Sequence, residues 1–162
     1  MRKGLLNNSI IFLLVSLMLL TSCGGAKEVT PQRIDEEVDI CGACSMMVQD
    51  NQYSAQIVAS SGTVSKFDDI GCMAMYINNY QPEGNAYVRD FYTKEWIEVG
   101  QSSFIFTDGV ETPMNYGFLS FSSKENLKKF LMEANGEELT WSSIVEKMKE
   151  RSSHDENQHT HN

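Results

Sequence analysis

Phe67-Asp68-Asp69-Ile70-Gly71-Cys72-Met73 lies between a predicted strand and a predicted helix. Either Asp68 or Asp69 can accept hydrogen bonds from the free backbone N–H groups at the start of a helix. The helix is expected to end near Tyr80, because residues 81–84 contain a proline and a glycine that interrupt it. The stretch therefore predicts a strand-to-helix junction, with a thiol in the first helical turn.

The segments around this junction give the order strand, strand, helix, strand, and the second half of the chain repeats it. The strands of the first half are expected at residues 53–58, 63–67 and 86–92. In the second half we expect strands at 103–106, 117–121 and 139–141 and a helix at 124–134, followed by a last helix at 143–150. The sequence therefore predicts an α+β fold of two small ββαβ units.

Composition divides the chain into a leader, a tether, a folded body and a tail. These parts are residues 1–22, 23–39, 40–151 and 152–162. Within the body, the two halves cover about 40–92 and 93–141, and the last helix covers 142–151. The tether is polar and acidic, which is typical of a flexible segment. The tail carries three histidines and is expected to be disordered, with divalent-metal binding as the alternative.

The leader has the features of an export signal. Two basic residues precede an apolar run at residues 10–20, which is too short to cross a bilayer. Leu20-Thr21-Ser22-Cys23 resembles a bacterial lipobox, and so Cys23 is expected to be acylated; an ordinary signal peptide is the alternative. We therefore expect a lipoprotein outside the cytoplasm. Gly24 is not the aspartate that favours inner-membrane retention, which is compatible with an outer membrane in an organism that has one.

The chain is acidic, with a formal net charge of −9 over 162 residues. Without a basic cluster, this charge argues against binding to nucleic acid and to anionic lipid headgroups. It suits a cationic ligand or a basic partner. The sequence contains no recognisable catalytic triad, phosphate loop or carboxylate pair at helical spacing, and so it does not indicate an enzyme.

Three cysteines remain once Cys23 carries lipid, namely Cys41, Cys44 and Cys72. An odd number leaves one thiol outside any set of disulfides, and metal ligation is one reason for a free thiol outside the cytoplasm. The C-x-x-C spacing of the first two can bring both sulfurs to one ion. Thioethers lie close to these thiols at Met46, Met47 and Met73. Thiolate and thioether sulfurs are soft ligands that favour Cu(I), and so we predict a Cu(I) site.

The sequence gives less support to other uses of these sulfurs. A structural zinc site needs four ligands, and the sequence offers three thiols, with every histidine in the tail. Thioredoxin-like enzymes place their C-x-x-C after a strand and at the start of a helix, whereas Cys41 precedes the first predicted strand. A structural disulfide among the three thiols stays open. Met75 is better explained as a core residue.

The motifs together resemble the NosL family of nitrous oxide reductase accessory lipoproteins. The resemblance rests on the lipobox, on Cys41-x-x-Cys44-x-Met46 and on the stretch 67–73. It continues, over about residues 40–141, through Tyr87-Val88-x-Asp90-Phe91, Trp96-Ile97, Pro113-Met114-x-x-Gly117, Phe121 and Ala134-Asn135-Gly136.

This resemblance implies two ββαβ units similar to the organomercurial lyase fold. It also implies a copper chaperone that delivers one Cu(I) to nitrous oxide reductase, together with a membrane ABC-type complex. We expect it to act as a monomer. The ligand candidates that the resemblance carries over are Cys41, Cys44, Met46, Cys72, Met73 and Met114. The family commonly has Cys-Pro-Val-Cys-Gly-Met, whereas this chain has Cys-Gly-Ala-Cys-Ser-Met at 41–46, which changes the stiffness of the turn.

Overall fold

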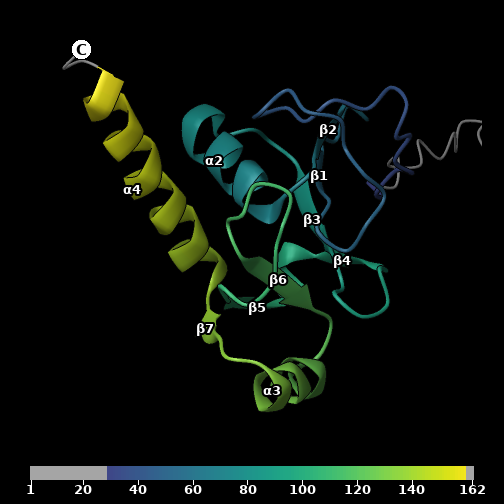
Figure 1. Ribbon diagram of the computed structural model, residues 1–162. Helices are drawn as coiled ribbons and strands as arrows, with labels where there is room; N and C mark the ends of the chain where they lie inside the picture. The colour runs from purple at the N-terminus through teal and green to yellow at the C-terminus, as the bar shows by residue number, and fades with distance from the viewer. Residues whose placement is uncertain (1–28, 160–162) are drawn as a thin grey trace, which may run out of the picture.

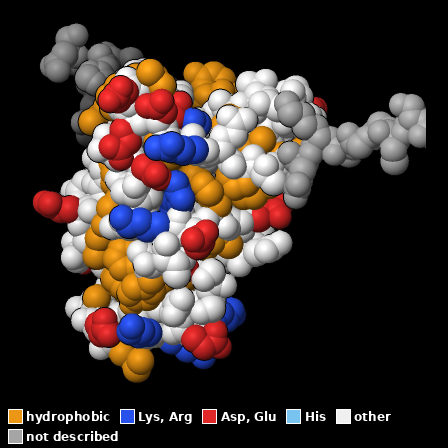
Figure 2. Space-filling view, turned by 90° about the vertical axis from the view of Figure 1, so that its right-hand side faces the viewer, with side chains coloured by type: hydrophobic (Ala, Val, Ile, Leu, Met, Phe, Trp, Pro, Cys, Tyr) orange, Lys and Arg blue, Asp and Glu red, His pale blue; other side chains and the backbone are white. Residues whose placement is uncertain are grey.

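The computed structural model describes residues 29–159, with side chains as far as Ser153. The predicted leader and the predicted lipid attachment site at Cys23 lie outside the described residues, as do 160–162. Within the described part, no helix is both long enough and apolar enough to span a bilayer. On the face drawn in Figure 2, Lys and Arg side chains lie among acidic and apolar ones rather than in one broad basic field.

The first half forms a four-stranded antiparallel sheet in the order β2-β1-β3-β4 (Figure 1). Its elements are β1 (Ala55–Val58), β2 (Val64–Phe67), helix α2 (Ile70–Tyr80), β3 (Asn85–Arg89) and β4 (Trp96–Glu98). The β1–β2 hairpin, the helix and β3 form the predicted ββαβ unit. The structure adds β4, which pairs with β3 and was not predicted.

The second half forms a three-stranded sheet in the order β6-β5-β7. A short 3-10 helix, η1 (Val99–Gln101), precedes β5 (Ser103–Phe106), β6 (Phe118–Phe121), helix α3 (Lys124–Glu133), β7 (Glu137–Leu139) and helix α4 (Trp141–His159). Because β5, β6, α3 and β7 repeat the order of the first unit, the predicted α+β fold of two ββαβ units is confirmed.

Helix α2 lies between the first sheet and α4 (Figure 1). Asp69, rather than Asp68, caps it, with its side chain accepting a hydrogen bond from Gly71 N at 2.8 Å. Its first five residues, 70–74, are buried, so the N-terminal end of the helix faces the core. Ile144 and Met148 of α4 belong to the same core cluster.

The structure differs from the sequence predictions at both ends of the body. Residues 31–39, predicted as part of a flexible tether, pack against the first sheet: Ile34 is 2 % exposed, and the backbone of Gln32 exchanges hydrogen bonds of 2.8 and 2.9 Å with the Gln56 side chain. At the other end, α4 continues to His159, where a disordered tail was predicted from residue 152.

Candidate metal site

The turn that carries Cys41 and Cys44 is fixed by backbone hydrogen bonds. Cys41 N donates to Met46 O at 2.8 Å, and Ser45 N donates to Cys41 O at 3.0 Å, which closes the turn. Gly42 N donates to Lys66 O at 2.9 Å, and this bond ties the turn to β2. The two thiols are therefore held beside the junction between β2 and α2.

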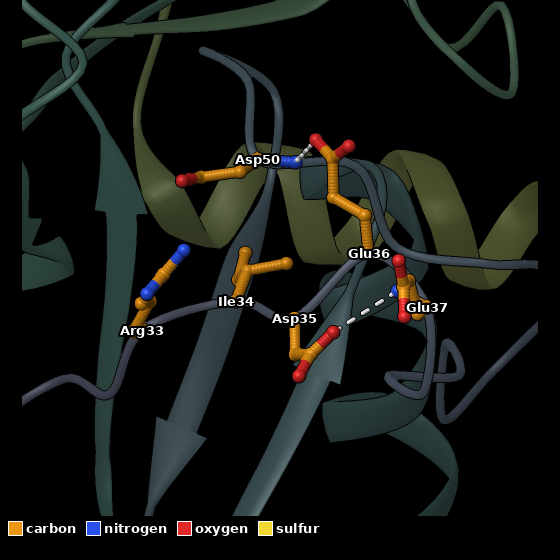
Figure 3. A pocket seen from close by; sticks show the side chains of 6 residues that line it. All are labelled: Arg33, Ile34, Asp35, Glu36, Glu37 and Asp50. Atoms are coloured by element: carbon orange, nitrogen blue, oxygen red, sulfur yellow. Dashed lines mark hydrogen bonds between the residues drawn. The ribbon is translucent and has the colours of Figure 1, made fainter.

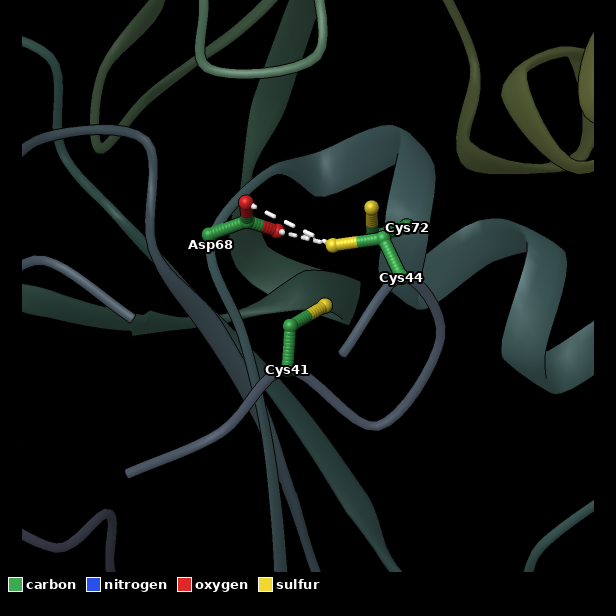
Figure 4. A group of neighbouring side chains, drawn as sticks. All are labelled: Cys41, Cys44, Asp68 and Cys72. Carbon is green, nitrogen blue, oxygen red and sulfur yellow. Dashed lines mark hydrogen bonds between the residues drawn. The ribbon is translucent and has the colours of Figure 1, made fainter. Parts of the chain in front are cut away.

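That junction supplies the other half of the site. Asp68 follows the last residue of β2, and Cys72 lies in the first turn of α2. The three sulfurs of Cys41, Cys44 and Cys72 and a carboxylate oxygen of Asp68 all lie within 4.8 Å of one another (Figure 4). All three cysteines are free thiols. Chain segments more than twenty residues apart thus place four potential metal ligands around one point.

The cluster is buried except on one side. Cys41 and Asp68 are each 2 % exposed and Cys72 is fully buried, whereas Cys44 is only partly buried. The Cys44 thiol lies 3.5 and 3.6 Å from the two carboxylate oxygens of Asp68. An ion that reaches this cluster from solvent therefore meets Cys44 first.

Contacts among the three thiols give them different pKa values. A hydrogen bond from the Cys72 thiol, with further bonds from backbone N–H groups of the turn and of Asp68, lowers the pKa of Cys41 to about 6. Burial, together with the neighbouring Cys41 and Asp68, raises the pKa of Cys44 to about 11. The hydrogen bond to Cys41 and burial likewise raise the pKa of Cys72. One thiolate, at Cys41, is thus prepared to receive a cation.

Asp69 connects the cluster to the second half of the protein. Its Oδ2 accepts hydrogen bonds from Thr112 Oγ1 at 2.7 Å and from Met114 N at 3.2 Å, while its Oδ1 caps α2. Burial raises the pKa of Asp69 against the effect of these donors. The backbone of Met114 is thereby fixed to the start of the helix that carries Cys72.

A surface hollow in the described part of the chain is lined by none of these thiols. It encloses about 780 Å³ and is lined by Arg33, Ile34, Asp35, Glu36, Glu37 and Asp50 (Figure 3). Two of its carboxylates already accept hydrogen bonds from backbone N–H groups inside the hollow, Asp50 N to Glu36 and Glu37 N to Asp35. It contains no sulfur ligand, and so the thiol cluster is the stronger candidate for a metal site.

Comparison with known proteins identifies the family of the chain. The family model of NosL matches residues 31–149. The chain belongs to the NosL family. The match begins within the segment that packs against the first sheet, which is consistent with a folded body that starts before residue 40.

One solved NosL structure shares the fold. The crystal structure of the copper chaperone NosL from Shewanella denitrificans aligns with a TM-score of 0.62 and 16 % sequence identity, covering 72 % of this chain and 96 % of that one. No curated protein matches the chain.

The six NosL-like ligand candidates fall into two groups. The three thiols meet in the cluster. The three methionines differ in exposure: Met46 is 51 % exposed beside the turn, Met73 is fully buried in the core, and Met114 is partly buried against the core cluster that includes Cys41 and Cys72. Their part as ligands stays a prediction.

Sequence reasoning missed Asp68 as a member of the cluster. It treated Asp68 and Asp69 as alternative caps for one helix, and the structure shows that Asp69 alone fills that role. The sequence did contain a signal for Asp68. A helix start needs only one capping aspartate, and so the other of two successive aspartates requires another role.

The turn at residues 41–46 differs from the common NosL sequence at Gly42 and Ser45, and the backbone at both residues shows the effect of the difference. Gly42 stands where the family commonly has proline, and its N–H donates to Lys66 O, a bond that proline cannot make. Ser45 stands where the family commonly has glycine and adopts a left-handed conformation with φ 62°. Ser45 therefore carries some backbone strain, because a left-handed conformation is unfavourable for a residue with a Cβ.

Proposed function

We propose that this NosL-family protein is a membrane-anchored, extracytoplasmic carrier of Cu(I). The observation that supports the proposal most strongly is the meeting of three thiol sulfurs within 4.8 Å at the junction between β2 and α2. Soft sulfur ligands suit Cu(I), and a buried cluster with one open side suits an ion that is held and then passed on.

Ligand exchange gives a mechanism for loading and release. Cys41, whose thiolate is favoured at neutral pH, attracts the cation, and Cys72 holds it from the helix side. Cys44, at the open side, is the first sulfur that an acceptor ligand can replace. Met46, half exposed in the same turn, provides a soft thioether along the exit path. The protein carries its cargo without changing it chemically, and so we propose a carrier and not an enzyme.

The proposed recipient is nitrous oxide reductase, reached with the help of a membrane ABC-type complex. Family membership supports this proposal, as does the acidic chain, which suits a basic partner. A lipid on Cys23 would keep the carrier, as a monomer, at the membrane surface where such a complex works.

Thiol–disulfide exchange is the second candidate, because the lowered pKa of Cys41 is also typical of a redox thiol. Reactive thiols of such enzymes are accessible to a partner disulfide, whereas Cys41 is 2 % exposed and Cys72 is fully buried. Burial of both thiols favours the metal carrier.

A transfer experiment tests the delivery step. The Cu(I)-loaded protein is incubated anaerobically with copper-free nitrous oxide reductase and its ABC-type complex, and copper in the enzyme is measured after separation. We expect copper to reach the enzyme faster than from a small-molecule Cu(I) complex of equal affinity. Equal rates from the two donors would contradict a chaperone role.

A further inference from the structure

The hairpin formed by residues 38–49 carries apolar side chains on both of its faces. Ile40 and Met47 lie opposite each other in an antiparallel bridge. Because side chains alternate between the two faces of a strand, their neighbours Cys41 and Val48 point the other way, into the core, where both are buried. The hairpin is therefore fixed to the protein by its inner face.

The outer face of the hairpin, which consists of Val38, Ile40 and Met47, lies in solvent. These side chains are 68, 50 and 40 % exposed. One apolar face is enough to hold an antiparallel pair against a core, and the other face is usually polar. The exposed large apolar side chains of the described residues are these three, the adjacent Met46, and Tyr80, Tyr92 and Met132. More than half of them thus lie within residues 38–47, and such a group typically marks an interaction surface.

This outer face adjoins the open side of the thiol cluster. Ile40 immediately precedes Cys41, and Met47 follows Cys44 by three residues. A backbone hydrogen bond of 2.8 Å from Cys41 N to Met46 O joins the two arms of the hairpin at the turn between them. A molecule that covers the outer face therefore also comes close to Cys44, the least buried thiol of the cluster.

Acidic side chains beside the outer face indicate the charge of a partner. Three exposed acidic residues, at positions 35–37, directly precede Val38. Together with Asp50 they line the hollow of Figure 3, where Arg33 is the only basic residue of the lining. Complementary charge across such a contact would come from lysine or arginine side chains placed next to an apolar centre.

Other occupants fit this surface less well. In a symmetric dimer each copy would present the same face to the other, so that two acidic 35–37 segments would be brought to one contact and would repel each other. The anionic headgroups of a bilayer would repel the same segment. A basic protein surface meets neither obstacle.

We propose that the outer face of the 38–49 hairpin is the docking surface for the protein that exchanges copper with the cluster, and that this protein presents an apolar centre beside lysine or arginine side chains. The inference rests on the proposed carrier function and adds the surface on which transfer takes place. Val38 and Ile40 carry no side-chain ligand atom, and so docking can be altered without removing a metal ligand.

The test measures partner binding and Cu(I) affinity in the same variants. The reduced, Cu(I)-loaded whole chain, in detergent and without oxygen, is passed over the immobilised ABC-type complex and, separately, over copper-free nitrous oxide reductase. Val38→Ser combined with Ile40→Ser should weaken binding by roughly tenfold or more, because two apolar contacts are lost, and should leave Cu(I) affinity unchanged. Met132→Ser, which alters an exposed apolar side chain on α3, is the control and should change neither property.

A second pair of variants tests the charge of the partner. Glu37→Lys should weaken binding several-fold at low salt and make it less sensitive to added salt. Glu146→Lys makes the same change of charge at an exposed position on α4 and should have a much smaller effect. This pair decides the question if the double serine variant does not fold.

The inference is overturned if wild type binds neither protein, or if the folded double serine variant binds as tightly as wild type. It is also overturned if wild type sediments as a dimer and the double variant as a monomer, because the outer face then binds a second copy. Cu(I) titration of wild type reports on the carrier function separately. Partner binding through this face by a chain that binds no Cu(I) would support the docking surface and contradict the proposed function.

Discussion

At the scale of single residues, Cys41 is the cluster thiol that ionises first. Its hydrogen bond from Cys72 lowers its pKa to about 6, whereas burial raises the pKa of Cys44 to about 11. We expect ultraviolet absorbance to show one thiolate forming near pH 6 and none of the others before pH 9. Cys41→Ser should remove the first step, and three thiols that ionise together would contradict this arrangement.

The same shift predicts how stability depends on pH. Between about pH 6 and the ordinary pKa of a thiol, the folded protein has released the Cys41 proton while the unfolded chain still holds it. The free energy of unfolding should therefore rise with pH across this interval, and the Cys41 contribution should be lost as pH falls through 6. Denaturant unfolding of wild type and Cys41→Ser at several pH values measures this difference.

Met46 can be tested against a matched methionine. Met46 is 51 % exposed beside the thiol turn, and Met132 is 81 % exposed on α3. Replacing either by isoleucine should leave folding nearly unchanged. Met46→Ile should lower Cu(I) affinity several-fold because a soft ligand is lost, whereas Met132→Ile should not. Equal affinities in competition titrations would exclude Met46 as a ligand.

Ser45 carries strain that the common NosL turn avoids. Its φ of 62° costs an L-residue about 1 kcal/mol, and glycine removes that cost but loses about 0.5 kcal/mol through greater freedom in the unfolded chain. Ser45→Gly should therefore stabilise the protein by about 0.5 kcal/mol in denaturant unfolding. Ser60→Gly, at an exposed turn residue without positive φ, serves as control; a gain there of the same size would contradict the strain argument.

At the scale of elements, the start of α2 meets the loop that carries Met114. A Cβ added at Gly71 would lie 2.2 Å from Tyr116 Cδ2, so this helix can approach the loop only with glycine at that position. Gly71→Ala should cost about 1–3 kcal/mol of stability and weaken Cu(I) binding, because the tyrosine ring has to move. Gly100→Ala, with nothing within 4 Å of the added atom, should change neither property. Thermal unfolding and Cu(I) titration of both variants test this prediction, and equal results for the two variants would contradict it.

The elements also show what sequence can predict. The strand-to-helix junction at 67–73 has local signals, a capping aspartate and alternating apolar residues, and these predicted the elements that place Cys72. The packing of residues 31–39 has no such signal, because it depends on contacts between residues far apart in the chain, among them the hydrogen bonds between Gln32 and Gln56 and the burial of Ile34. Asp68 was missed for the same reason, since its proximity to Cys44 is tertiary.

At the scale of the whole molecule, the site lies where the two ββαβ units are joined. The thiols belong to the first unit, and Asp69 ties their helix to Thr112 and Met114 of the second. One core cluster includes Cys41 and Cys72 together with Phe104 and Phe118 of the second sheet. The complete fold, and not the C-x-x-C turn alone, therefore holds the ligands close together.

The most direct test is an anaerobic titration of the reduced whole chain, in detergent, with Cu(I) against a competing chelator. We predict one tightly bound Cu(I) per chain, with much weaker binding in Cys41→Ser and in Cys72→Ser. Retention of no Cu(I) by the wild-type protein would contradict the copper-carrier account and leave the three thiols to a redox, structural or zinc-binding role.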